Sequence, residues 1–156
     1  MRYWLMKTEP DVFSLDDLLN RTEEFWDGVR NYQARNFMRD DMRVGDKVLF
    51  YHSNANPSGI AGICEIVKEA LPDVSALNAK SEYYDASSTK ENIKWFAVTV
   101  GKGKPFKRFL SLQELKVQPE LKDMLVIKKG QRLSIQPVTK DEWTFICKLG
   151  GGFSND

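Results

Sequence analysis

The sequence has few of the residues on which most catalytic and metal sites depend. Its 156 residues include one histidine, His52, and two cysteines, Cys64 and Cys147. A zinc site would have to gather ligands from scattered positions. His52 and Ser53 are neighbours on an expected strand and point to opposite faces, which makes a direct catalytic pair poorly placed. We therefore expect no catalytic residue, no metal site and no cofactor.

Signals for secretion and for membrane insertion are also missing. The N-terminus has no apolar segment of the signal-peptide kind, and no window approaches about 18 apolar residues. Without a secretory context, Cys64 and Cys147 are predicted to be buried free thiols rather than a disulfide. We expect a soluble, cytoplasmic protein that does not contact a membrane.

Net charge is close to zero. The chain carries 23 basic and 22 acidic residues, which gives a formal charge of +1. A protein that binds nucleic acid by phosphate neutralisation alone is usually more basic. Any contact with nucleic acid must therefore come from a local patch of cations, or the ligand is small.

Common enzyme motifs are absent as well. The sequence has no nucleophile elbow, no P-loop and no dinucleotide-binding fingerprint. Residues 101–105, Gly-Lys-Gly-Lys-Pro, resemble a phosphate loop only loosely. We predict a solvated hairpin turn there, because glycine and proline are typical of such turns.

What the sequence does contain is a pattern of strands and short helices. Strands are predicted over residues 3–6, 47–51, 59–69, 93–100, 105–110 and 132–137. Helices are predicted from Ser14, over about 32–40, from Ser111, and from Thr139 to 149, with a surface excursion over 71–92. The pattern indicates an α+β domain around a curved, barrel-like sheet of five or six mostly antiparallel strands. We predict one domain over residues 1–156, with a flexible tail at 150–156.

Residues 26–36 hold the most specific combination in the chain. Aromatic faces stack on flat rings, amides read donor and acceptor edges, and arginines hold phosphate. The candidate binding residues here are Trp26, Arg30, Asn31, Tyr32, Arg35 and Asn36. The alternatives are purely structural roles: a core tryptophan, solvated arginines and an asparagine that caps a helix. Because these residue types occur together in one short segment, we favour a pocket for a nucleobase.

A second polar cluster ends an otherwise apolar strand. Tyr51, His52 and Ser53 follow the run of residues 47–50, and strand ends at a barrel mouth expose side chains to ligands. An ordinary transition from strand to turn is the alternative. Trp95 is equally compatible with a core position and with a ligand wall. Gly59 and Gly62 permit a close approach of backbone or form a bend.

Five segments together resemble the EVE domain. They are YWLMKTEP at 3–10, WDGVRNYQARN at 26–36, FYHS at 50–53, GIAG at 59–62 and RLSIQP at 132–137. The family includes stand-alone bacterial proteins and is related to thymocyte nuclear protein and to YTH domains, which read methylated adenine in RNA. The resemblance spans nearly the whole chain and implies a PUA-like pseudo-barrel. It also implies a non-enzymatic reader of modified bases in DNA or RNA.

The same resemblance implies a role for most of the candidate residues. Trp26 and Trp95 would wall the pocket; Lys7, Thr8, Asn31, Tyr51, His52 and Ser53 would contact the base edge; and Arg30, Arg35 and Arg132 would hold phosphate. A small anion such as a buffer sulfonate is also expected to fit, and no obligate protein partner is expected. The competing interpretation is a hydrolase or other enzyme acting on modified nucleosides, with His52, Ser53 or Lys7 in acid–base roles.

Overall fold

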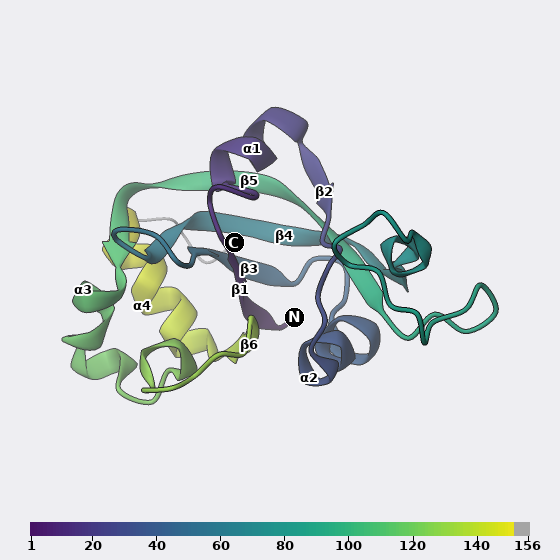
Figure 1. Cartoon of the computed structure of the whole chain (residues 1–156). Coiled ribbons are helices and arrows are strands. Elements are labelled where there is room, and N and C mark those ends of the chain that lie inside the picture. The colour runs from purple at the N-terminus through teal and green to yellow at the C-terminus, as the bar shows by residue number, and fades with distance from the viewer. Residues whose placement is uncertain (152–156) are drawn as a thin grey trace.

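Residues 1–151, the part of the chain that the structure describes, fold around one six-stranded sheet (Figure 1). The structure is a computed structural model. The strands are β1 (Tyr3–Thr8), β2 (Glu23–Phe25), β3 (Lys47–His52), β4 (Gly59–Pro72), β5 (Phe96–Ser111) and β6 (Ile135–Val138), in the order β2-β5-β4-β3-β1-β6. β1 pairs parallel with β3, and the other neighbouring strands pair antiparallel. The predicted α+β architecture is confirmed.

Short helices flank this sheet. They are α1 (Leu15–Arg21), α2 (Tyr32–Asn36) with a π-helical turn (Phe37–Asp41), α3 (Leu112–Lys116) and α4 (Lys140–Gly151). Three 3-10 turns cover Val74–Leu77, Pro119–Leu121 and Leu125–Ile127. Ser14, Ser111 and Thr139 each accept a hydrogen bond from the amide three residues on, as the capping patterns predict.

The predicted flexible tail is wrong at its start. α4 continues through Gly150 and Gly151, and Gly150 is buried against the ring of Phe106. Packing of the last helical turn therefore extends the helix to Gly151, beyond its predicted end at 149. The rest of that prediction, residues 152–156, lies outside the described residues.

Two predictions about strands are also wrong. β2 lies just before Trp26, where no strand is predicted, and it forms because it pairs with β5. Residues 101–105 lie inside the bent strand β5 and form no hairpin turn. β2 pairs with β5 only over residues 99–101, so Pro105 lies where β5 has one neighbour, a position that tolerates its missing amide hydrogen. A Cβ on Gly62 would lie 2.2 Å from the carbonyl oxygen of Lys104, so this glycine permits close approach of β5.

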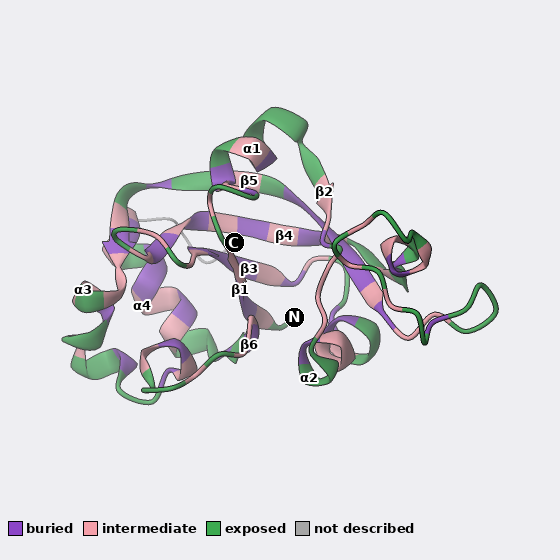
Figure 2. Cartoon of the chain, viewed as in Figure 1, coloured by how far each residue is buried: buried purple, intermediate pink, exposed green. Residues whose placement is uncertain are grey.

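Hydrophobic cores cover both faces of the sheet, and much of β3, β4 and β5 is coloured as buried in Figure 2. Trp4, Met6 and Phe50 belong to the core that packs against α1, while Leu5 and Leu49 belong to the core that packs against α3 and α4. Successive residues of β1 and β3 thus serve opposite cores, as strand geometry requires. No helix within residues 1–151 combines the length and apolar character needed to cross a bilayer.

Both cysteines are buried and free, as predicted. Cys64 lies in the first core and Cys147 in the second, so the two thiols are on opposite sides of the sheet. Burial raises the pKa of Cys64 well above its ordinary value and raises the pKa of Cys147 to about 12. The protonated thiols behave as small apolar groups in these cores.

The parallel pairing of β1 with β3 positions the candidate site. Because the strands run in the same direction, their C-terminal ends reach the same edge, with Lys7 opposite Tyr51 and Thr8 opposite His52. The amide of Ser53 donates to the carbonyl oxygen of Thr8 at 2.9 Å. Residues more than 40 positions apart are thereby brought together.

Candidate functional site

A cavity of about 820 Å³ opens at the edge of the sheet where β1 and β3 end. Four segments line it, drawn from residues 7–13, 21–30, 53–54 and 131–134, and Tyr83 completes the wall. Pockets for small ligands commonly measure roughly 300–1,000 Å³. The cavity is therefore large enough for a heterocyclic ring and part of the group attached to it.

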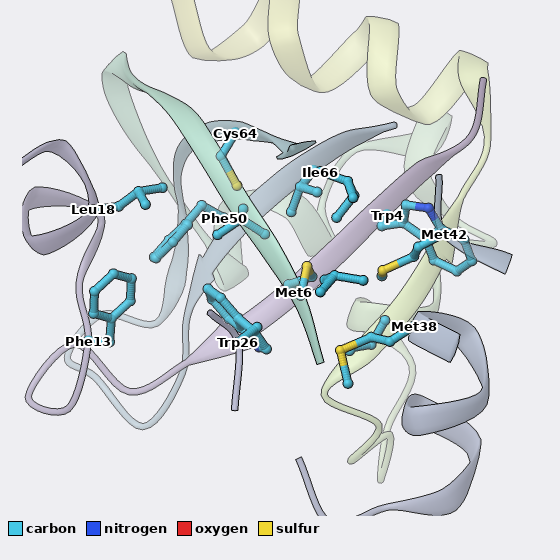
Figure 3. Close-up of a cluster of buried hydrophobic side chains, with 14 of the residues drawn as sticks. Trp4, Met6, Phe13, Leu18, Trp26, Met38, Met42, Phe50, Cys64 and Ile66 are labelled. Atoms are coloured by element: carbon cyan, nitrogen blue, oxygen red, sulfur yellow. The ribbon is translucent and has the colours of Figure 1, made fainter. Parts of the chain in front are cut away.

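Trp26 belongs both to the core and to the cavity wall. Its side chain is 7% exposed and meets the rings of Phe13 and Phe50 edge to face, with centroid distances of 6.1 and 5.6 Å (Figure 3). The backbone amide donates to the carbonyl oxygen of Val98 at 2.9 Å, which fixes the residue at the end of β2. Among residues 1–151, the indole Nε1 has no hydrogen-bond partner. The core thus holds the indole rigidly while a small part of it borders the cavity.

The cavity gathers six of the thirteen predicted site residues, from four separate parts of the sequence. They are Lys7, Thr8, Trp26, Arg30, Ser53 and Arg132. The hydroxyl of Thr8 donates to the carbonyl oxygen of Phe13 at 3.0 Å, which anchors the loop after β1. The amide of Lys7 donates to the carbonyl oxygen of Ser134 at 2.8 Å and joins β1 to the segment before β6.

Two cations at the cavity have no acidic partner. Among the described residues, neither Lys7 nor Arg132 lies within ion-pair distance of a carboxylate. Lys7 is half-buried, burial lowers its pKa, and its Nζ lies 5.7 Å from the centroid of the Tyr51 ring. Arg132 is exposed at the rim. An anionic ligand group would therefore be stabilised at this end of the cavity.

Arg30 lines the cavity, but its N–H groups donate hydrogen bonds to other groups of the protein. The guanidinium donates to Asp73 Oδ2 at 3.0 Å, to the carbonyl oxygen of Val29, to Ser75 Oγ, and twice to the carbonyl oxygen of Tyr83. These bonds use all five N–H donors of an arginine. The structure therefore does not support the predicted phosphate contact of Arg30, which instead clamps the loop of residues 73–95 onto the segment after β2.

Trp95 lies in a separate aromatic cluster outside the cavity lining. Its ring stacks on Tyr32 at 4.7 Å, and its indole donates to Asp85 Oδ2 at 2.8 Å. Arg35 lies 4.7 Å from the Tyr32 ring centroid and donates to Asn36 Oδ1 and to a backbone carbonyl. Four predicted site residues therefore stack or hydrogen-bond within the protein, namely Tyr32, Arg35, Asn36 and Trp95. None of them lines the cavity, so Trp95 does not face Trp26 across it.

The other three predicted site residues also have local structural partners. Asn31 caps α2 by accepting from the amide of Ala34 at 2.9 Å, the alternative weighed above. Tyr51 is buried in the second core, and burial raises its pKa. His52 Nε2 accepts from the amide of Leu15 at 3.2 Å, and burial lowers its pKa. Residues 1–151 contain no group of three or more His, Cys, Asp or Glu arranged to hold a metal ion.

Sequence reasoning missed several cavity residues, above all Asp27 and Tyr83. Asp27 stands inside the segment of residues 26–36, but an Asp-Gly pair is typical of a turn and does not by itself indicate a ligand contact. Tyr83 is remote in sequence, but its ring lies directly over Gly28, where an added Cβ would come within 2.5 Å of it. Gly28 has φ of +85°, a conformation that also favours glycine. The Asp-Gly pair of a turn is visible in the sequence, whereas the partner of Gly28 is not.

Comparison with known proteins places this architecture in one family. The model of the EVE domain matches residues 2–149. A protein of known crystal structure from Pseudomonas syringae is 50% identical, with a TM-score of 0.90 over 94% of this chain and 98% of that one. Human THYN1, crystallised in complex with DNA containing 5-methylcytosine, is 42% identical, with a TM-score of 0.89 over 99% of this chain and 100% of that one.

The curated relatives correct one prediction. Thymocyte nuclear protein 1 from chicken and from human are each 43% identical over 94% of this chain, which spans 68% and 73% of their lengths. These relatives are named as nuclear proteins, which contradicts the predicted cytoplasmic location. That prediction rested on a missing secretory signal, and such a signal does not separate nucleus from cytoplasm. The PUA-like fold is confirmed, and the chain belongs to the EVE domain family.

Proposed function

We propose that this domain binds nucleic acid carrying a modified base, and that the base enters the cavity beside Trp26. The observation that carries the proposal is a ligand-sized cavity that an indole borders and at which Lys7 and Arg132 lack acidic partners. The complex of human THYN1 with 5-methylcytosine DNA supports a ligand of the same class.

The geometry suggests that different groups provide affinity for the strand and specificity for the base. Lys7 and Arg132 hold the phosphate next to the extruded nucleotide, which suits a chain whose net charge is only +1. The cavity then distinguishes bases. Filling a slot with one methyl group contributes ~1–3 kcal/mol. Because Trp26 is only 7% exposed, the base contacts part of the indole and completes its packing against other cavity walls such as Tyr83.

We propose binding rather than catalysis. In the competing hydrolase hypothesis, His52 acts as an acid or base, yet its Nε2 is engaged with the amide of Leu15 and the residue is not part of the cavity lining. Incubation with a panel of modified nucleosides, followed by mass spectrometry, tests this directly. Unchanged nucleosides are expected, and turnover that Lys7→Gln abolishes would favour the enzyme.

Two tryptophans give a matched test of the binding site. Trp26 and Trp95 are almost equally buried, at 7% and 6% exposed, but only Trp26 lines the cavity. Binding is measured by fluorescence anisotropy with short DNA and RNA oligonucleotides that carry one modified base or its unmodified counterpart. We expect tighter binding of a modified strand, a loss of affinity of several-fold or more in Trp26→Phe, and little change in Trp95→Phe. Equal affinity for all strands, or equal losses in both variants, would overturn the proposal.

A further inference from the structure

Three carboxylates line the cavity, and they differ in what they contact. Glu24 is paired with Arg21, whose Nη1 lies 3.3 Å from Glu24 Oε1. Glu9 lies at the exposed rim. Asp27 directly follows Trp26, and among residues 1–151 its carboxylate has neither an ion pair nor a hydrogen bond to another side chain. Asp27 is therefore the acceptor that stands next to the indole and remains available to a ligand.

The backbone holds Asp27 in place from both sides. Its own amide donates to the carbonyl oxygen of Phe25 at 2.8 Å, and the preceding amide of Trp26 donates to Val98. The following amide, from Gly28, donates to Asp73 Oδ2 at 2.9 Å. A carboxylate on so constrained a backbone loses little freedom when it accepts a hydrogen bond from a ligand.

The charges around Asp27 leave its carboxylate short of positive partners. Burial, and then repulsion from Asp73 and Glu82, raise the pKa of Asp27, while Arg30 and a hydrogen bond from the backbone of Asp27 itself lower it. Arg30 is itself bound to Asp73 at 3.0 Å, so it neutralises that carboxylate first. N–H donors from a ligand would stabilise the ionised form of Asp27 in these surroundings.

On the basis of the function proposed above, we infer that Asp27 accepts a hydrogen bond from the exocyclic amino group of the bound base. An ionised carboxylate only accepts hydrogen bonds. It therefore matches the N4 amino group of cytosine or the N6 amino group of adenine, and it opposes the O4 acceptor of thymine or uracil. The domain prefers amino-bearing bases to their oxo counterparts, and Asp27 sets that preference.

5-Methylcytosine and thymine provide a matched pair of probes. The two bases share the 5-methyl group and differ in an amino or an oxo group at position 4 and in the proton at N3. Binding is measured with DNA strands identical except for this base. Wild type is expected to bind the 5-methylcytosine strand about tenfold tighter. In Asp27→Asn the ratio should fall to about one, because an amide both donates and accepts.

Glu120→Gln is the control, since it removes the same unit of charge from an exposed residue outside the cavity lining. Its ratio should match wild type, and melting curves of both variants establish that they fold. If the strands bind but wild type does not distinguish them, or if Asp27→Asn keeps the wild-type ratio, this inference alone is overturned. If none of the modified or unmodified strands binds, the proposed function is overturned and the inference falls with it.

Discussion

The ring of Phe50 meets the indole of Trp26 edge to face, with centroids 5.6 Å apart and planes at 85°. Phe50 is fully buried in β3, whereas Trp26 reaches from the same core to the cavity. Trp26 therefore both stabilises the core and borders the cavity, and truncating its side chain would affect stability and binding at once. Variants at this position must therefore be compared for stability before they are compared for binding.

Trp26→Ala should destabilise the domain strongly. Removing a buried tryptophan costs about 3–5 kcal/mol, because the cavity left behind collapses only in part. Trp26→Phe keeps an aromatic ring against Phe50 and should cost less. Denaturant unfolding of both variants measures the difference. A loss below about 1 kcal/mol in Trp26→Ala would mean that the indole contributes little to the core.

Arg30→Ala should act on stability more than on nucleic-acid binding. The substitution leaves Asp73, whose side chain is 1% exposed, without its cation. Asp73 keeps hydrogen bonds from Ser75 and Gly28, so we expect a loss of about 2–3 kcal/mol, at or below the range for breaking a buried pair. Arg39→Ala removes a surface pair with Asp40 and should change the free energy of unfolding much less, because solvent screens an exposed pair. Similar losses in the two variants would contradict this account.

Arg132→Ala should weaken binding of modified and unmodified strands alike. The side chain is exposed and has no acidic partner among residues 1–151, so stability should stay within about 0.5 kcal/mol of wild type. Loss of one phosphate contact lowers the slope of log affinity against log salt concentration by about 0.7–0.9. The control is Lys116→Ala, exposed on α3 away from the cavity lining. An unchanged slope in Arg132→Ala would exclude this phosphate contact.

His52 should make stability depend on pH. Burial holds its pKa below the ordinary value, and nearby Asp16 opposes this only in part. At about pH 7.5 and above, well over the ordinary value of about 6.5, the imidazole is almost entirely neutral in both states and does not affect stability. As the pH falls below that value, the unfolded chain takes up the proton first, and the free energy of unfolding decreases.

His52→Gln separates this effect from other titrations. The glutamine carbonyl can accept the amide of Leu15 but carries no titrating group, and the chain has no other histidine. Between about pH 7.5 and 5.5, chemical denaturation should show a smaller loss of stability in the variant than in wild type. Equal losses would mean that His52 titrates as it does in the unfolded chain.

Local sequence patterns predicted the fold well, and the site less completely. The caps at Ser14 and Ser111 depend on residues three positions apart, so spacing alone identifies them. Arg30 and Arg35 instead donate hydrogen bonds to the carbonyl oxygens of Tyr83 and Lys94. The fold brings these partners from more than 50 positions away, so the sequence does not show them. A cluster of aromatic and cationic residues predicts a binding pocket and an internal clamp equally, and only the partners decide between them.

The pairing of β1 with β3 explains what the sequence did predict about the site. Lys7, Thr8 and Ser53 were proposed on the resemblance and on a strand end, and the parallel register brings them to one edge. Asp27 escaped notice because Asp-Gly is a common turn. Its availability depends on contacts that the sequence does not show, since Arg30 is bound to Asp73 and Arg21 to Glu24.

The most direct test of the central claim follows the indole N–H resonance of Trp26 in an NMR titration with an oligonucleotide carrying one 5-methylcytosine. Comparison with Trp26→Phe assigns this resonance among the four tryptophans. Trp143, 2% exposed in the second core, is the internal control. Saturable movement of the Trp26 resonance with Trp143 unmoved is the predicted result. Saturable binding that leaves the Trp26 resonance in place would contradict the account.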